Sequence, residues 1–439
     1  MMSVQDFLEK RFNLSKCGTT PKTELTAGVT TFMTMAYILA VNPGILSAAG
    51  MDPAAVFGAT ALSALIATLV MAFGANMPFA LAPGMGLNAF FAFTVVKVMG
   101  YSWQFALTAV FLEGIIFLIL TATNLREAII NCIPLPIKHA ISAGIGLFIA
   151  FIGFKNAGIV VAHPATLVSL GDMLTGPALV CMAGLIITGI LIARKVTGAL
   201  LFGILASTVI GIFCGVTDLA HFDMSAMFRI PDMSPILFQL DFHKIFTPDM
   251  GIVLLTFLFV DMFDTVGTLV GVASKACMLD EDGCVPRAKQ ALFADAIGTT
   301  VGALLGTSTV TTYVESAAGV AEGGRTGLTA LTVAVLFGLA LFVAPVFLLV
   351  PGAATAPALI IVGLFMMSPI KNINLEEYTD SIPAFLTIVM MPFTFSIAEG
   401  IVFGMMSYVL IKLLTGRRDE IPVLSYALFI LFALKLYMH

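Results

Sequence analysis

The stretch PFALAPGMGLNAFFAF, residues 78–93, places two prolines, two glycines and an asparagine inside one of the most apolar regions of the chain. Pro78 and Pro83 forbid a regular helix before Leu87, because proline lacks an amide proton and clashes with the preceding turn. Broken backbone inside a membrane must be satisfied by neighbouring protein or face a cavity. We therefore expect this segment to be interrupted and to line a cavity midway through the membrane.

The composition is that of a polytopic membrane protein. The chain has 439 residues, of which 59% are hydrophobic and 11% charged, whereas a soluble domain typically has about 25% charged residues. The mean hydropathy is +1.05. Windows of roughly 20 apolar residues, long enough to cross about 30 Å of hydrocarbon, recur along nearly the whole sequence. The sequence therefore predicts an all-α multi-pass protein of the cell membrane, surrounded by lipid and binding no nucleic acid.

The apolar windows predict fourteen membrane spans in two sets of seven. After an N-terminal segment at 1–26, the predicted regions are spans 1–4 at 27–121, spans 5–7 at 138–215, a polar connection at 216–248, spans 8–11 at 250–350, spans 12–14 at 354–415 and a tail at 416–439. Lys and Arg gather in alternate short loops, as expected when the N-terminus is cytoplasmic. The apolar run 421–438 either lies on the membrane or forms an extra span.

An odd number of spans in each half predicts an inverted repeat, because the second half then enters the membrane in the opposite sense. The third span of the second half begins GTSTVTTYVESAAGVAEGG, residues 306–324, and its β-branched residues favour a strand. Interrupted segments at matching positions of two halves indicate the central site of a transporter. We expect residues 79–82 and 309–314 to pair with each other. The alternative is two proline-kinked helices packed by their neighbours.

Acidic residues inside the predicted spans indicate where that site lies, since each costs roughly 2.5–3.5 kcal/mol in the membrane. The stretch FLFVDMFDTVGTL, residues 257–269, places Asp261 and Asp264 on one helix face, and Glu315 follows the second extended piece. Carboxylates accept hydrogen bonds when ionised and donate one when protonated, which suits the N–H and C=O edge of a planar heterocycle. We expect Asp264 and Glu315 to bind substrate and, with Asp261, to carry a coupled proton. Asp261 either contacts the substrate directly or supports the site through a hydrogen bond.

The interrupted segments supply further candidate contacts. The Asn88 amide donates and accepts at once, as a nucleobase edge requires; the alternative is an interhelical hydrogen bond of about 0.6 kcal/mol. Candidate stacking rings are those of Phe79, Phe90 and Phe91; the alternative for each is lipid-facing packing, since the chain has 36 phenylalanines. The other expected substrate contacts are Ser316, Gly86 and Thr312. Glu113 and Lys155 are also ionisable residues in predicted spans, and the sequence assigns them no role.

The sequence indicates no metal site, no cofactor and no enzyme. Its six cysteines lack zinc-like spacing, the Gly-rich stretch at 321–330 lacks the phosphate-loop Gly-Lys-Ser/Thr, and the histidines lie near span ends, in loops or at the terminus. An anion carrier is the alternative transporter. Glu315 argues against it, because an anion carrier would leave its helix N-termini free for negative charge.

Several stretches carry a resemblance to a known family: TTFMTMAYILAVNP (30–43), APGMGLNAFFAF (82–93), FDTVGTL (263–269), YVESAAGVAEGGRTGLTA (313–330) and IPAFLTIVMMPFTFSIAEGI (382–401). They resemble the nucleobase cation symporter-2 family, and more narrowly its AzgA-like branch of permeases for adenine, guanine and hypoxanthine. The resemblance covers nearly the whole chain.

The resemblance implies a seven-plus-seven inverted repeat with a core domain, spans 1–4 and 8–11, and a gate domain, spans 5–7 and 12–14, that often dimerises. It implies proton-coupled import of purine nucleobases, and we expect elevator-like alternating access. Residue by residue, the family's span-eight acid matches Asp264, its span-ten acid Glu315 and its span-three asparagine Asn88. Uracil-type relatives have a histidine where this chain has Thr268, so the resemblance does not extend to their details of proton coupling.

Overall fold

The computed structural model describes residues 4–123, 134–217, 219, 228–275, 278, 285–422, 425–426, 428–430 and 432–433. Outside them lie parts of the predicted N-terminal segment, connecting loop and tail, with Cys132, Cys277 and Cys284. Within the described residues, eight helices are long and apolar enough to cross a membrane, and two shorter apolar helices accompany them. The prediction of a mostly helical, polytopic membrane protein is confirmed. The count of fourteen spans stays a prediction.

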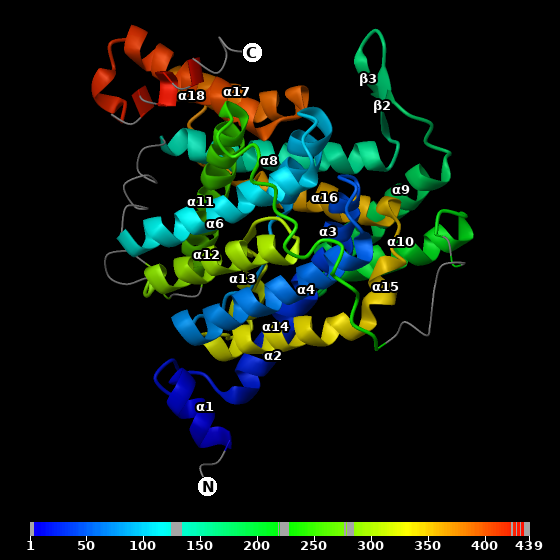
Figure 1. Ribbon diagram of the computed structural model, residues 1–439. Helices are drawn as coiled ribbons and strands as arrows, with labels where there is room; N and C mark the ends of the chain where they lie inside the picture. The colour runs from blue at the N-terminus through cyan, green and yellow to red at the C-terminus, as the bar shows by residue number, and fades with distance from the viewer. Residues whose placement is uncertain are drawn as a thin grey trace.

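The first half of the chain is helical except at one central strand and one hairpin (Figure 1). Its elements are α1 (Val4–Phe12), α2 (Pro21–Met35), α3 (Ile38–Ser47), α4 (Pro53–Val70), η1 (Met71–Ala75), β1 (Leu81–Pro83), α5 (Met85–Ala89), η2 (Phe90–Val98), α6 (Trp103–Thr123), α8 (Leu135–Asn156), β2 (Val160–His163), β3 (Leu167–Leu170), α9 (Gly176–Ala193) and α10 (Ala199–Phe213). Both η1 and η2 are π-helical. Thr20 and Asp52 cap α2 and α4, each followed by proline at the first helical position.

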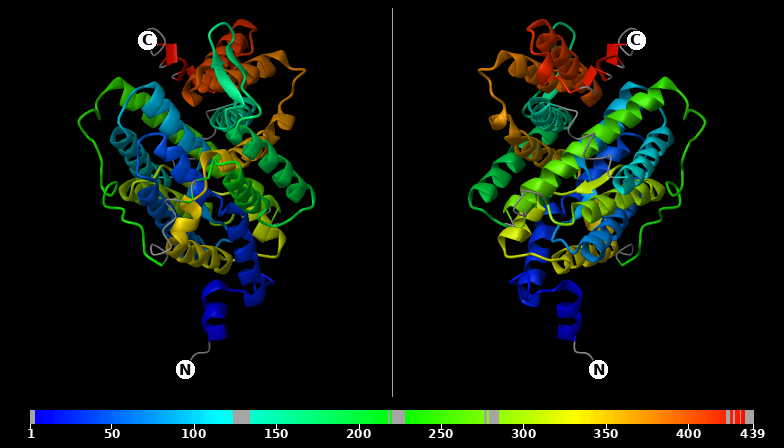
Figure 2. Two further views of the ribbon diagram at one scale, coloured as in Figure 1. Left: turned by 90° about the vertical axis from the view of Figure 1, so that its right-hand side faces the viewer. Right: turned by 90° about the vertical axis from the view of Figure 1, so that its left-hand side faces the viewer.

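The second half repeats the pattern of long helices around one short strand. Its elements are α11 (Pro248–Lys275), α12 (Ala288–Leu305), β4 (Val310–Thr312), α13 (Ser316–Ala321), α14 (Gly327–Ala340), η4 (Leu341–Val343), α15 (Ala344–Leu348), α16 (Gly352–Met366), η5 (Ser368–Asn372), α17 (Tyr378–Thr394), α18 (Ile397–Leu414) and η6 (Arg418–Glu420). Helix α1 projects from one side of the bundle and the β2–β3 hairpin lies on the opposite side (Figures 1 and 2).

Strands β1 and β4 pair antiparallel at the centre of the molecule, with Leu81 opposite Thr312 and Pro83 opposite Val310. Two flanking backbone bonds extend the ladder: Gly84 donates to the Thr309 carbonyl at 2.9 Å and Tyr313 donates to the Ala80 carbonyl at 3.0 Å. All six strand residues are buried. The prediction that the two extended segments pair is confirmed. The pairing satisfies backbone groups that would otherwise be unbonded inside the bundle.

Each strand is also held by a threonine from the helix that precedes it. The Thr68 hydroxyl of α4 accepts from the Leu81 amide at 3.0 Å and lies 3.1 Å from its carbonyl. The Thr299 hydroxyl of α12 donates to the Val310 carbonyl at 2.9 Å. Both halves therefore use the same device, a helical threonine that bonds the backbone of the strand following it.

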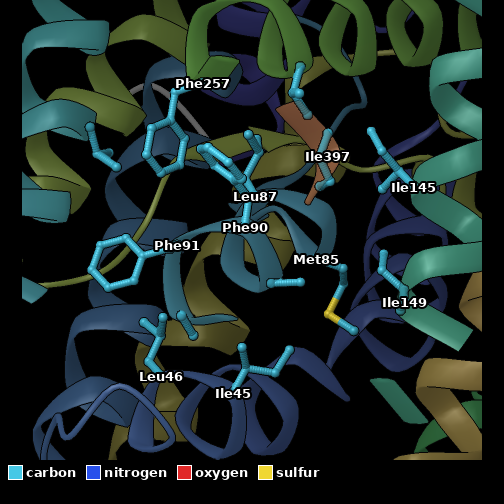
Figure 3. Close-up of a cluster of buried hydrophobic side chains, with 14 of the residues drawn as sticks. Ile45, Leu46, Met85, Leu87, Phe90, Phe91, Ile145, Ile149, Phe257 and Ile397 are labelled. Atoms are coloured by element: carbon cyan, nitrogen blue, oxygen red, sulfur yellow. The ribbon is translucent and has the colours of Figure 1, made fainter. Parts of the chain in front are cut away.

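The largest apolar cluster packs around α5 and η2, the helix that follows β1 (Figure 3). Phe90 lies edge-on to Phe257 of α11, with ring centroids 4.9 Å apart. On the other side, Met85 is drawn beside Ile149 of α8, and Ile145 lies farther along the same helix. The face between α5 and α8 is thus lined by hydrocarbon side chains.

An aromatic cluster surrounds Phe395, the C-cap residue of α17, where η2 meets α8. Its ring contacts those of Phe93 on η2 and of Phe148 and Phe151 on α8, at centroid distances of 5.9, 5.2 and 5.9 Å. Lys155 Nζ lies 4.7 Å from the Phe395 ring centroid, a favourable cation–π contact. Phe395 has φ +54°, a left-handed conformation that is unusual for a bulky residue.

Candidate functional site

The candidate site is built around the two ends of the β1–β4 ladder, where each strand turns into a helix. Gly84 is the N-cap of α5 and Glu315 is the N-cap of α13. A Cβ at Gly84 would lie 2.7 Å from the Thr311 side chain, so only glycine lets the strands approach here. Asn88 belongs to the first half of the chain and Glu315 to the second half. The single pair of strands β1 and β4 therefore positions both residues.

Glu315 is fixed by a tyrosine from the first half. The Tyr37 hydroxyl donates a hydrogen bond of 2.7 Å to Glu315 Oε1. Tyr37 lies at a turn between α2 and α3 and is 1% exposed, whereas Glu315 keeps partial exposure. The carboxylate is thus oriented from the buried side and keeps a second oxygen for another partner.

Asp264 is the second partly exposed carboxylate at this place. It interacts electrostatically with Glu315 and with Asp295 of α12. Asp264 and Glu315, the two carboxylates that the sequence singled out, therefore lie close enough to interact electrostatically. Asp295, which is fully buried, also interacts with Asp264.

Asp261 lies deeper, bonded to a threonine behind the ladder. The Thr265 hydroxyl is 3.2 Å from Asp261 Oδ1, 2.9 Å from Asp295 Oδ1 and 2.8 Å from the Thr311 hydroxyl of β4. Asp261, Thr265 and Asp295 are all fully buried. This cluster ties α11 and α12 to β4, so Asp261 supports the strand rather than sharing the exposure of Asp264.

Asn88 is fully buried and half-satisfied. Its Oδ1 accepts a hydrogen bond from the Ser308 hydroxyl. Its Nδ2 has no hydrogen-bond partner among the residues that the structure describes. Because an unsatisfied buried donor costs about 1–3 kcal/mol, this amide is suited to donate to a ligand acceptor.

The remaining predicted contacts have different surroundings. Phe79 is fully buried in an apolar cluster with Met77 and Leu269. Ser316 accepts a hydrogen bond of 3.0 Å from the Ala80 amide. Gly86 faces α8, where an added Cβ would lie 2.6 Å from the Ile145 side chain. Thr312 Oγ1 is buried, with no hydrogen-bond partner in the described part of the chain.

Comparison with known proteins identifies the family. A model described as "Permease family" matches residues 22–403. The chain belongs to this family. Adenine permease AdeQ of Escherichia coli is 45% identical over 430 residues, covering 98% of this chain and 96% of that protein. Guanine/hypoxanthine permease PbuG of Bacillus subtilis is 44% identical over 434 residues, covering 96% and 98%. These relatives confirm the resemblance to nucleobase cation symporters, and they are transporters rather than enzymes.

A solved structure has the same fold as this permease family member. The transmembrane domain of the cyanobacterial bicarbonate transporter BicA superposes with a TM-score of 0.66, covering 86% of this chain and 97% of that domain. The sequences are 16% identical, so the likeness concerns the fold alone.

The structure brings three further buried polar residues to the permease's ladder. Sequence reasoning missed Tyr37 and Asp295, and it named Glu113 without assigning it a role. The Glu113 carboxylate accepts a hydrogen bond of 2.6 Å from the Thr309 hydroxyl. An available signal was the rule that intramembrane ionisable residues mark functional sites, which applies to Asp295 in the predicted span 286–305. Tyr37 lies in a family-like stretch, but its partner is 278 residues away.

Proposed function

We propose that the chain is a secondary active permease that imports purine nucleobases, namely guanine, hypoxanthine or adenine, by proton symport. The observation that carries the proposal is the placement of Asp264, Glu315 and Asn88 around one buried ladder. Support also comes from relatives named as adenine and guanine/hypoxanthine permeases over nearly the full length.

In the proposed complex, the carboxylates of Glu315 and Asp264 bind one part of the base and the amide of Asn88 binds another. Tyr37 occupies Glu315 Oε1, so Oε2 is proposed to accept a ring N–H. Asp264 would accept a second N–H when ionised and donate when protonated. Asn88 Nδ2, unpartnered among the described residues, would donate to a carbonyl or ring nitrogen.

The stacking and lining contacts follow from the same segments. Phe79 is proposed as the stacking ring, which requires it to turn from the apolar cluster around Met77. Ser316, Thr312 and the backbone near Gly86 would line the site.

Proton coupling is proposed to use Asp264 and Glu315, with Asp261 as a supporting group. Two carboxylates that share a poorly solvated volume favour having one proton between them, because two charges repel strongly there. Binding of a base with its own N–H donors would change which carboxylate keeps the proton. The substrate and the proton would then cross together.

Movement of the site is proposed to be elevator-like. The core domain would comprise 27–121 and 250–350, and the gate domain 138–215 and 354–415. Matching threonine–strand bonds in both halves support an inverted repeat. The hydrocarbon face between α5 and α8 supports sliding, since it has few directional bonds to break. We further propose a cytoplasmic N-terminus and a homodimer formed through the gate domain.

An anion carrier is the second candidate, favoured by the fold likeness to a bicarbonate transporter. The carboxylates argue against it, because Glu315 places negative charge where an anion would bind.

The test is uptake by proteoliposomes of purified protein with radiolabelled guanine, hypoxanthine and adenine, and separately with bicarbonate and sulfate. We expect purine uptake that an inward proton gradient accelerates. E315Q should abolish purine uptake. The control is E399Q, which removes the carboxylate of Glu399 in the first turn of α18 and should retain purine uptake at equal protein content. Anion uptake without purine uptake would replace the first candidate by the second. Purine uptake indifferent to a pH gradient would remove proton symport alone.

A further inference from the structure

We infer that Glu113 is a positioning residue for substrate binding, which acts by holding the segment 307–309 that leads into β4. The inference rests on the proposed purine transport and names a residue outside the proposed contacts. Glu113 lies at the middle of α6 and is fully buried. A carboxylate in such surroundings requires a partner that justifies its burial.

Three consecutive residues of the second half are each held by a polar side chain of the first half. Asn42 Nδ2 of α3 donates to the Thr307 hydroxyl at 3.0 Å. Asn88 of α5 accepts from the Ser308 hydroxyl. Glu113 Oε2 accepts from the Thr309 hydroxyl at 2.6 Å.

These six side chains are all fully buried, and the three first-half partners come from different helices. A segment bonded at successive residues from three directions has little freedom to shift. Glu113 contributes the direction from α6.

Helix α6 is a fixed support for this bond because it lies directly against α12. A Cβ on Gly114, the neighbour of Glu113, would lie 2.4 Å from Thr300 Oγ1 and 2.8 Å from the Thr300 backbone nitrogen. Helix α12 in turn ends just before residue 307. The carboxylate and the segment that it binds are therefore positioned by the same pair of helices.

Thr309 connects Glu113 to both sides of the proposed site. Its carbonyl accepts from the Gly84 amide at 2.9 Å, and Gly84 is the N-cap of the helix that carries Asn88. In the other direction, β4 runs from Val310 to Thr312 and leads to Glu315. Loss of the Glu113–Thr309 bond would loosen Asn88 and Glu315 relative to each other.

The geometry makes one demand on Glu113. The residue must present an acceptor oxygen to Thr309, which glutamine also does, and it need not carry a proton. Loss of the Glu113–Thr309 bond would misplace the residues that contact the substrate and so weaken substrate binding. The variant should therefore have a raised KM and a nearly unchanged maximal rate.

The experiment measures hypoxanthine and guanine uptake by E113A, E113Q, T309V and the double variant E113A/T309V in proteoliposomes. We expect E113A and T309V each to raise KM about tenfold with a maximal rate within about twofold of wild type. The double variant should raise KM no more than either single one, because both remove the same bond. E113Q should keep KM within about threefold of wild type.

T108V is the matched control. Thr108 is a buried polar residue of the same helix. Its hydroxyl accepts from the Asp241 amide at 2.7 Å and donates to the Gln104 carbonyl at 2.9 Å rather than bonding to 307–309, so the KM of T108V should equal that of wild type. Additive effects in the double variant, an unchanged KM in E113A, or a maximal rate abolished in E113Q would each overturn the inference. Lack of purine uptake by wild type would instead overturn the proposed function, so the two failures are distinguishable. If E113A does not fold, T309V and T309S apply the same test. T309S keeps the hydroxyl that bonds to Glu113, so its KM should equal that of wild type, whereas T309V should raise KM about tenfold.

Discussion

The Tyr37 hydroxyl donates a 2.7 Å hydrogen bond to Oε1 of Glu315, a residue 278 positions further along the chain. The bond joins a turn in the first half to the helix N-cap that carries the proposed substrate acceptor. Because Tyr37 bonds to Oε1, it orients the Glu315 carboxylate and leaves Oε2 for the proposed bond to substrate. Tyr37 is thus the residue through which the first half sets the direction of the Glu315 carboxylate.

Removing this hydroxyl should weaken purine binding. In Y37F the Glu315 carboxylate loses a donor, and hydrogen bonds to charged groups contribute about 1.5–3 kcal/mol, so KM for hypoxanthine uptake should rise at least about tenfold. Y101F is the control, since Tyr101 bonds to Asp249 outside the site. An unchanged KM in Y37F would show that Glu315 does not need this orientation.

The Asn88 amide should matter through its nitrogen more than through its oxygen. N88A removes both the acceptor for Ser308 and the proposed donor to the base, whereas S308A removes only the donor to Asn88. We expect KM to rise about tenfold in N88A and about threefold in S308A, one neutral hydrogen bond being worth about 0.5–1.5 kcal/mol. Titration of purine binding by thermal shift checks the order. Equal losses in both variants would assign Asn88 a purely structural role.

Glu24 should stabilise the protein without touching substrate. Its buried carboxylate accepts from the amides of Arg325, Thr326 and Thr329 at 2.9, 3.2 and 3.2 Å, where α14 begins. In E24A these N–H groups lose their acceptor, so the free energy of unfolding should fall by about 3 kcal/mol. Thermal unfolding in detergent measures this, with T26V on the same helix as the control. A normal melting temperature in E24A, or a selective rise in KM, would contradict the prediction.

The partly exposed ion pair of Glu377 and Arg417 should make stability depend on pH at the acidic end. Hydrogen bonds from Thr379, and next from Arg417, lower the pKa of Glu377 from 4.5 to about 2. A lowered pKa means that the charged form is favoured in the folded protein. The stabilisation is therefore complete above pH 4.5 and is lost as the pH falls towards 2. Between pH 5 and pH 3, wild type should lose more thermal stability than E377Q. Parallel curves for the two proteins would refute the assignment.

The sequence predicted those parts of the site that depend on local chemistry. Pro78 and Pro83 exclude a helix whatever surrounds them, and β-branched residues at 310–312 favour extension, so the paired strands were predictable. The positions of Asp264 and Glu315 followed from the expense of charge in a membrane.

The rest depends on tertiary contacts that no local pattern encodes. Tyr37 and Glu113 meet partners from the other half of the chain, and the local sequence around each residue does not indicate these partners. Phe79 illustrates the same limit, because any phenylalanine near a break can stack on a ligand or pack inside, and here the ring is packed. The turn at Tyr37 within the first predicted span was not foreseen either, since the residues around it favour a continuous helix.

The ring of Phe395 is shared among three neighbours from two different helices. If η2 slides along α8, Phe93 must leave a ring that Phe148 and Phe151 continue to hold. Edge-to-face contacts are short-ranged, so they rupture early in such a displacement, before contacts on the far side form. In the proposed elevator-like movement, loss of the Phe93–Phe395 contact would therefore add to the barrier at one end of the sliding surface and increase the temperature dependence of turnover.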